Sequence, residues 1–354
     1  MHHTLKPLSD QTIVITGGTS GIGLCTALEA AQRGAKVILV SRNEEVMREV
    51  TDRIQRNGGD ADYFVADVGD RDAIRRVVDE IVTRHGGFDT WVNNAGVGIY
   101  ASLEETSDED HERIFRTNYF GVVNGSLEAL KHLKRRGGAL INVGSISSEM
   151  PAPVLSAYTA SKHAVKGFTD SLRLELIHEG APVSVTLIKP SGIHTPFGQH
   201  AKNYMDGFSK VPPPVYHPRL VAEAILHAAE HPTRDILVGA AGALQVKLAH
   251  LMPRLADRVF AAAFYRTAVD YDRAKRQGPK GLHQSAAEGR ILGDQPESPV
   301  SVSPYTWAQM HPGATAAMLV GGVATIGAIL AARNGGDKRA HRPAQRGRLA
   351  PQYG

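Results

Sequence analysis

The chain has 354 residues, and 42% of them are hydrophobic, which is enough for one large α/β domain with appendages. A single cysteine excludes a disulfide framework within the chain and is typical of a reducing compartment. The net charge is +4, but residues 333–354 alone carry six Lys or Arg against one acidic residue, so the body is nearly neutral. We therefore expect no nucleic-acid partner, and we interpret the basic tail as a solvated arm or a membrane-surface contact.

Strand and helix patterns alternate through the first 240 residues. This alternation predicts an α/β fold, a doubly wound parallel sheet (Rossmann-like) of about seven strands with helices on both faces. In such a sheet the ligand crevice lies at the carboxyl ends of the strands, where Gly17, Asn94, Ser145 and Pro190 fall. The expected strands are 12–16, 36–41, 62–66, 88–92, 139–144, 183–188 and 235–239, and the expected helices include 21–33, 43–57, 70–85, 108–136, 156–179 and 218–230.

The first expected strand runs directly into a glycine-rich turn, residues 16–23, and an apolar helical run follows. Glycine permits the positive φ of a tight turn and leaves room for a pyrophosphate, and the helix N-terminus offers free N–H groups to an anion. This context predicts a dinucleotide site, whereas the alternative is an ordinary loop between a strand and a helix. The predicted cofactor contacts in this turn are Gly17, Thr19, Ser20, Gly21, Ile22 and Gly23.

Tyr158 and Lys162 lie four residues apart, so one helix face carries both side chains. A phenol titrates near pH 10, and lowering its pKa by about three units requires about 4 kcal/mol of selective stabilisation of the phenolate. A neighbouring ammonium supplies part of this stabilisation. The alternative is a surface helix pair, but Ser145 stands thirteen residues before the tyrosine and the glycine turn precedes both. This order favours a catalytic site, and no metal site is predicted.

The turn Gly17-x-x-x-Gly21-x-Gly23 resembles the T-G-x-x-x-G-x-G turn of the short-chain dehydrogenase/reductase family, Tyr-x-x-x-Lys type. The resemblance covers about residues 9–240, and a C-terminal extension follows. One position departs from the family pattern, because Ser191 stands where a glycine usually follows the proline of the last motif. The other matching positions occur in the family's order: Asp67, Asn93, Asn94, Ala95, Gly96, Asn118, Ser145, Tyr158, Lys162 and residues 190–195.

The resemblance implies a role for each matching position. Tyr158 exchanges a proton with the substrate oxygen, Ser145 donates a hydrogen bond to that oxygen, and Lys162 contacts the nicotinamide ribose. The backbone of Asn118 holds a water that links the lysine to solvent, although a local pairing of this asparagine is the alternative. Further cofactor contacts implied are Asp67 and Val68 at the adenine, Asn94, Ala95 and Gly96 by the adenine ribose, and Pro190, Gly192, Ile193 and Thr195 on the nicotinamide side.

The end of the second expected strand indicates which cofactor is bound. An acidic residue there would bond the adenosine ribose hydroxyls and repel a 2′-phosphate, but this chain has Ser41 and Arg42. A guanidinium recognises phosphate well and a serine adds a donor, so we expect NADP(H) rather than NAD(H). The alternative is that the arginine faces solvent at the start of a helix.

These features predict an NADP(H)-dependent oxidoreductase that interconverts a carbonyl and an alcohol, acting on a lipophilic ketone, aldehyde or secondary alcohol. Residues 192–214 are expected to form a lid with Phe197, Tyr204, Met205 and Phe208, and Met150, Pro151 and Pro153 a second wall. The alternatives are a non-catalytic nucleotide-sensing or membrane-scaffold protein on the same fold, and an epimerase or dehydratase that retains its cofactor. The resemblance also implies a homodimer or homotetramer packed through the helices at 108–136 and 156–179.

The pattern changes after the catalytic domain, which we place at 1–240. Residues 241–275 are expected to form an amphipathic helical extension, either packed on the domain or a partner, or lying on a membrane. An uncharged run of nineteen residues, 314–332, nearly matches a bilayer core and is expected to anchor the chain; a buried interface helix or a disordered tail is the alternative. No secretory signal is evident, so we expect a cytoplasmic catalytic domain. The remaining segments are a flexible linker at 276–313 and a basic tail at 333–354.

Overall fold

The computed structural model describes residues 4–274, 281–285, 289–318, 320 and 325. Its centre is a seven-stranded sheet in which every neighbouring pair is parallel, in the order β10-β7-β6-β4-β1-β2-β3. The predicted doubly wound sheet is therefore confirmed. The strands are β1 (Thr12–Thr16), β2 (Lys36–Ser41), β3 (Ala61–Val65), β4 (Thr90–Asn93), β6 (Gly138–Val143), β7 (Val183–Pro190) and β10 (Asp235–Val238).

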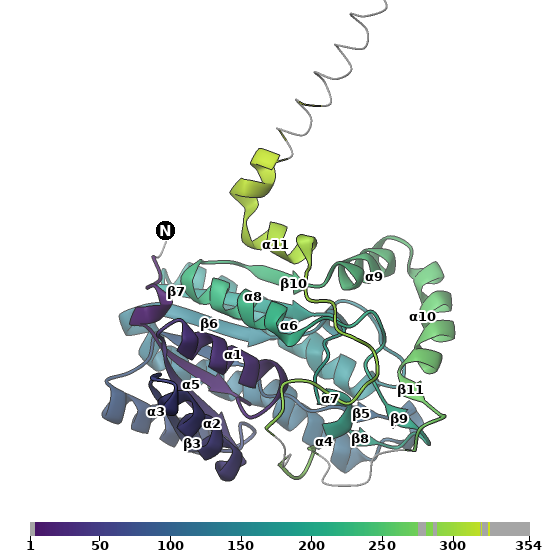
Figure 1. The fold of residues 1–354 in the computed structure, drawn as a ribbon, viewed down its shortest axis with the longest axis horizontal. Coiled ribbons are helices and arrows are strands. Elements are labelled where there is room, and N and C mark those ends of the chain that lie inside the picture. The colour runs from purple at the N-terminus through teal and green to yellow at the C-terminus, as the bar shows by residue number, and fades with distance from the viewer. Residues whose placement is uncertain (1–3, 275–280, 286–288, 319, 321–324, 326–354) are drawn as a thin grey trace, which may run out of the picture. The chain divides into compact units, whose positions relative to one another are not determined.

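Helices cover both faces of this sheet. On one face α1 lies along α8, as Figure 1 shows, and on the other α3 packs against α5. The central strands are buried on both sides, which explains why they read as continuous apolar runs rather than as alternating patterns. The helices are α1 (Gly21–Gln32), α2 (Glu44–Arg56), α3 (Arg71–His85), α4 (Asp108–Phe115), α5 (Gly121–Arg136), α6 (Ser156–His178) and α8 (Pro218–Glu230).

The single helix expected at 108–136 is interrupted. A π-helical turn, η3 (Arg116–Phe120), separates α4 from α5 and carries Asn118. A π turn widens the hydrogen-bond ladder locally, and such turns frequently occur at functional sites. Because every residue in the run is compatible with an α-helix, the sequence pattern does not reveal the interruption.

Short helices and strands order residues 192–214, the segment expected to form a lid. The chain after the small helix α7 (Phe197–His200) is held by two short strand pairs, β5–β8 and β9–β11. The remaining elements are β5 (Ile99–Tyr100), β8 (Lys202–Asn203), β9 (Phe208–Ser209), β11 (Val269–Asp270) and the 3-10 helices η1 (Leu8–Asp10), η2 (Leu103–Glu105) and η4 (Ile146–Ser148).

The helical extension consists of two helices, α9 (Ala240–Leu251) and α10 (Pro253–Thr267), rather than one continuous stretch. The break falls at Met252, whose backbone leaves the helical conformation (φ −135°, ψ 61°) directly before a proline that cannot continue α9. α10 packs onto the body through Ala256 and Phe260, which cluster with the buried Met150. This arrangement agrees with a helix packed on its own domain.

Part of the segment expected to be a linker packs against the body. Leu282 is fully buried, and Thr306, in α11 (Pro304–Met310), is also buried. The chain divides into two compact units, residues 1–307 and 308–354. Among the described residues no helix is both long and apolar enough to span a bilayer. Most of the expected anchor at 314–332 lies outside those residues, as does the basic tail.

Candidate active site

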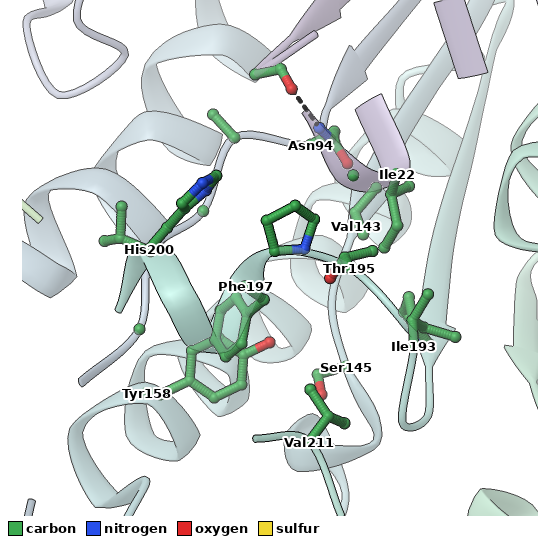
Figure 2. Close-up of a pocket in the computed structure, with 18 of the residues that line it drawn as sticks. Ile22, Asn94, Val143, Ser145, Tyr158, Ile193, Thr195, Phe197, His200 and Val211 are labelled. Carbon is green, nitrogen blue, oxygen red and sulfur yellow. Dashed lines mark hydrogen bonds between the residues drawn. The ribbon is translucent and has the colours of Figure 1, made fainter. Parts of the chain in front are cut away.

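One elongated cleft runs along the carboxyl ends of β1, β2, β4, β6 and β7, where the topology of the sheet predicted it. Figure 2 shows part of this cleft, with Tyr158 packed against Phe197 and facing the same space as Ser145, Ile193 and Thr195. Of the predicted site residues, all except Gly23 and Asn118 line this cleft: Gly17, Thr19, Ser20, Gly21, Ile22, Ser41, Arg42, Asp67, Val68, Asn94, Ala95, Gly96, Ser145, Tyr158, Lys162, Pro190, Gly192, Ile193 and Thr195.

The glycine turn is built by backbone contacts that exclude side chains. Gly17 has a φ of +68°, and a Cβ on it would lie 2.8 Å from the Ala95 Cα. A Cβ on Gly23 would overlap the Gly17 carbonyl oxygen, so this residue stands behind the turn and allows α1 to start close to β1. The Asn94 side-chain amide donates to the carbonyl oxygens of Thr16 (3.0 Å) and Gly17 (3.2 Å). Asn94 therefore locks the turn from the neighbouring strand.

Charged and polar groups gather at the end of the cleft where the sequence predicts the adenosine, which we call the adenosine end. The Asp67 carboxylate accepts hydrogen bonds from the Arg113 guanidinium (2.6 Å) and the Gly69 N–H (2.9 Å). Burial acts to raise the pKa of Asp67, but these two bonds outweigh it and hold the pKa below its usual value. The carboxylate is thus charged and fixed beside Arg42. A bare glycine turn at a helix N-terminus together with this polar end fits a dinucleotide.

Tyr158 stands at the opposite end, near the first turn of α6, with Ser145 across the cleft. Ser145 caps η4, because its hydroxyl accepts from the Ser147 N–H at 3.0 Å, and this bond fixes the side chain. The Phe197 ring meets the tyrosine ring edge-on, with centroids 5.1 Å apart. Burial raises the pKa of Tyr158 to about 12, and a hydrogen bond with Ser145 opposes this. Burial thus outweighs the hydrogen bond with Ser145 and keeps the phenol protonated at neutral pH.

Lys162 lies beneath the tyrosine, 3% exposed as a residue. Its ammonium donates to the Val143 carbonyl oxygen at 2.8 Å and lies 5.7 Å from the centroid of the Tyr158 ring. Burial lowers the pKa of Lys162 from 10.5 to about 8. The side chain thus faces the cleft as predicted. With a pKa of about 8, a minor fraction of Lys162 is neutral at physiological pH.

This depressed pKa predicts how stability depends on pH. The folded protein binds the Lys162 proton less tightly than the unfolded chain, so the burial penalty is full below pH 8 and is relieved as the pH rises toward 10.5. Between pH 7 and 9.5 the wild type should gain about 2 kcal/mol of unfolding free energy relative to Lys162→Met, measured by urea denaturation. Lys166→Met, one turn along α6 in a pair with Asp170, is the control and should follow the wild type. Parallel curves for wild type and Lys162→Met would contradict the burial effect.

Asn118 lies outside the cleft wall. Its side chain accepts from the Val97 N–H (2.8 Å) and donates to the Val97 carbonyl (3.0 Å) and the Ser161 hydroxyl (3.1 Å). It therefore ties the π turn η3 to α6 and to the loop after β4. A Cβ on Gly96 would lie within 3.7 Å of both the Asn118 Oδ1 and the Lys162 Nζ, so the asparagine is close to the lysine without lining the cleft.

Ser191, the departure from the family pattern, is accommodated by two glycines that start α9. A Cβ on Gly239 would overlap the Ser191 hydroxyl, and one on Gly242 would lie 2.5 Å from the Ser191 Cβ. The serine side chain thus occupies space that these glycines leave open. On the far side of the same loop, Thr195 lies against the glycine turn, where a Cβ on Gly21 would be 3.1 Å from the Thr195 Cβ. The loop after β7 therefore closes against the turn after β1.

The substrate end of the cleft is mostly apolar. Of the expected lid, Phe197 lines it, whereas Tyr204, Met205 and Phe208 do not, and neither do the expected wall residues Met150, Pro151 and Pro153. Tyr204 instead donates to the Asp110 carboxylate at 2.5 Å. The sequence missed residues that come from distant segments and carry no local motif: Tyr100, Leu155, Gln245 and Phe264. The expected amphipathic helices of residues 241–275 were the single signal for the last two.

Comparisons with known proteins agree with this geometry. The family model described as short chain dehydrogenase matches residues 11–205. The chain is 42% identical over 326 residues to an uncharacterized oxidoreductase, YxnA, of Bacillus subtilis, which covers 90% of this chain and 91% of that protein. It is 34% identical over 193 residues to a 3beta-hydroxysteroid dehydrogenase of Mediterraneibacter gnavus, covering 54% of this chain and 69% of that protein.

Solved structures show the same fold with a nicotinamide cofactor in place. A metagenomic short-chain oxidoreductase in complex with NADP superimposes with a TM-score of 0.57 at 26% identity, over 66% of this chain and 98% of that one. Similar structures hold NAD in one case and NADP in others. These structures thus support a nicotinamide cofactor, but they do not distinguish NAD from NADP for this chain.

Proposed function

Because the chain belongs to the short-chain dehydrogenase/reductase family and is an oxidoreductase, we propose that it interconverts a carbonyl and an alcohol with NADP(H), using Tyr158 as general acid and base. The observation that carries this proposal is the meeting of three groups at one cleft: Ser145, Tyr158 and Lys162 face the same space. The glycine turn opens onto the other end of that cleft.

The protonation states favour proton donation to a substrate oxygen. With its pKa raised to about 12, Tyr158 carries its proton at neutral pH and can donate it to the developing alkoxide of a carbonyl substrate. Ser145, fixed by its cap on η4, can donate a second hydrogen bond to the same oxygen. When bound, the nicotinamide supplies the hydride and, once oxidised, a positive ring.

Lys162 is the group that can stabilise the phenolate form of Tyr158. Its ammonium lies 5.7 Å from the Tyr158 ring centroid, and below pH 8 it carries a charge that stabilises a phenolate. We also propose that it contacts the nicotinamide ribose, and that the backbone of Asn118 helps to hold a water leading from the lysine to solvent. In the oxidative direction the same groups act in reverse, with the phenolate as base.

Arg42 supports NADP(H) over NAD(H). It lines the adenosine end beside Ser41, whose hydroxyl lies 3.5 Å from that of Thr19, and these donors suit a 2′-phosphate. Asp67, held by Arg113, and Val68 would then border the adenine.

The apolar end of the cleft supports a lipophilic substrate. Tyr100, Leu155, Phe197, Val211 and Phe264 surround the space above the catalytic tyrosine. Such walls favour a ketone, an aldehyde or a secondary alcohol with an apolar body, because burying apolar area stabilises binding by about 25 cal/mol per Å².

We also propose a homo-oligomer that packs through α4, α5 and α6. Large apolar side chains stand exposed on two of these helices or at their ends, namely Phe120 (50%), Leu174 (68%) and Ile177 (69%). A second copy would cover them.

Turnover with NADPH and a panel of lipophilic ketones and aldehydes tests the proposed function. We expect net oxidation of NADPH that depends on the carbonyl compound. This oxidation is measured as the loss of the dihydronicotinamide absorbance, and NADPH without a carbonyl compound is the control. Cofactor binding without turnover of any panel compound would favour a nucleotide sensor. Conversion of a substrate without net NADPH consumption would indicate an epimerase or dehydratase.

A further inference from the structure

The chain returns to the cleft after α10. We call the returning segment the strap, residues 281–285 and 289–297, which lies within the first compact unit (Figure 1). Gly281 and Ser285 of the strap line the same cleft as Arg42 and Asp67. The strap therefore forms part of the wall of the adenosine end, although Gly281 lies 239 positions after Arg42 in sequence.

One end of the strap accepts hydrogen bonds from Arg42. The guanidinium donates to the carbonyl oxygens of all four residues 281–284, and the shortest of these bonds is 2.7 Å, to Gly281. The neighbouring Arg113 donates to the Leu282 carbonyl at 2.9 Å. Carbonyl oxygens carry no net charge, so they orient the guanidinium without cancelling the charge that would attract a phosphate.

The middle of the strap contacts the glycine turn. The Gly21 N–H, at the start of α1, donates to the Arg290 carbonyl at 2.9 Å. Next to it, Gly289 lies against α2, where an added Cβ would be 3.1 Å from the Val46 Cγ1. The strap thus meets both helices that border the phosphate end of the cleft.

The strap also reaches the opposite side of the cleft, formed by the loop after β7. The Gly281 N–H donates to the His200 carbonyl at 2.7 Å, and the His194 ring lies 3.2 Å from the Gln295 carbonyl oxygen. Gly293 packs directly on Thr195, because an added Cβ would lie 2.5 Å from the Thr195 carbonyl oxygen. The segment therefore bridges the two sides between which the dinucleotide would lie.

We propose that the strap is a latch across the cofactor cleft, which must detach before NADP(H) can bind or leave. This inference rests on the proposed function. The two sides of the cleft belong to the sheet and its helices. The strap is attached through hydrogen bonds and two side-chain contacts with the body, His283–Asp110 (2.7 Å) and Glu297–Lys210 (3.0 Å), and Leu282 is its one fully buried large apolar side chain among the described residues. Such weakly packed segments open at the lowest free energy, and the strap has glycines at 281, 289 and 293.

A loosening variant tests the latch. Gly293→Ala forces a methyl group against the Thr195 carbonyl and should push the strap off one side of the cleft. We expect NADPH to dissociate at least about tenfold faster, measured by stopped-flow fluorescence on displacement with excess NADP⁺. Gly313→Ala is the matched control, since nothing lies within 4 Å of a Cβ there and its release rate should equal that of the wild type.

A locking variant tests it from the other direction. The distance from Gly289 to Val46 suits a disulfide between Val46→Cys and Gly289→Cys, and the one native cysteine, Cys25, is buried. In the oxidised double variant we expect both binding and release of NADPH to slow at least about tenfold, and reduction with dithiothreitol should restore the wild-type rates.

The outcomes separate the latch from the proposed function. Release rates unchanged both in Gly293→Ala and in the oxidised double variant, in a protein that still binds NADPH, would overturn the latch alone. A wild type that binds neither NADPH nor NADH would overturn the proposed function, and the latch with it. Both readouts follow the cofactor directly and require no knowledge of the substrate.

Discussion

Replacing Tyr158 with Phe is expected to lower kcat by about 10²–10⁴-fold, the usual contribution of a positioned general acid. The hydroxyl is the one group removed, while the ring keeps its edge contact with Phe197. Because the ring and the glycine turn are unchanged, NADPH should bind with nearly wild-type affinity. Steady-state kinetics on a responsive carbonyl compound, together with cofactor fluorescence, measure the two effects separately.

The control for this variant is Tyr63→Phe. Tyr63 lies on β3 with its hydroxyl 3.5 Å from Glu44, away from the cleft, and its loss should leave kcat unaltered. An unchanged kcat in Tyr158→Phe would remove the tyrosine mechanism. A loss of cofactor binding as large as the loss of turnover would instead assign the residue a structural role.

The second large effect is expected from Arg42→Asp, which should weaken NADPH binding by about tenfold or more while NADH binding is weakened far less. A hydrogen bond to a charged group contributes about 1.5–3 kcal/mol, and an aspartate would in addition repel the 2′-phosphate. Since Arg42 also holds the strap, both affinities can fall together to some extent. The ratio of the two dissociation constants, measured by titration, is therefore the informative quantity.

Arg48→Asp provides the matched charge change. Arg48 is an exposed residue of α2, a few positions from Arg42, and reversing its charge should leave the ratio near that of the wild type. Equal affinities of the wild-type protein for NADPH and NADH would contradict the assignment of a 2′-phosphate site.

The sequence predicted the sheet and one end of the cleft well because these depend on local signals. Strand β1, the glycine turn and α1 are consecutive, and their apolar runs and glycines show the order of elements directly. The Tyr158–Lys162 pair follows in the same way from helical periodicity. Parallel-sheet topology then brings the loops after β1, β4, β6 and β7 to one edge, so the site residues meet although they are far apart in sequence.

The strap could not be predicted in this way. The strap binds Arg42 through backbone carbonyl oxygens, which every residue possesses, so no side-chain pattern marks the contact. Its composition of Gly, Pro, Ser and Gln therefore suggested only a linker. Phe264 and Gln245 also reach the cleft through long-range packing of α9 and α10.

The most direct test of the account is the fate of the hydride. NADPH carrying deuterium at both C4 positions of the nicotinamide is supplied with a carbonyl compound that the enzyme reduces, and the alcohol is analysed by mass spectrometry. Hydride transfer from the nicotinamide should place one deuterium on the carbinol carbon for each NADPH oxidised, and this transfer should be strongly slowed in Tyr158→Phe. An alcohol formed without the label, or formed at the same rate without the tyrosine hydroxyl, would contradict it.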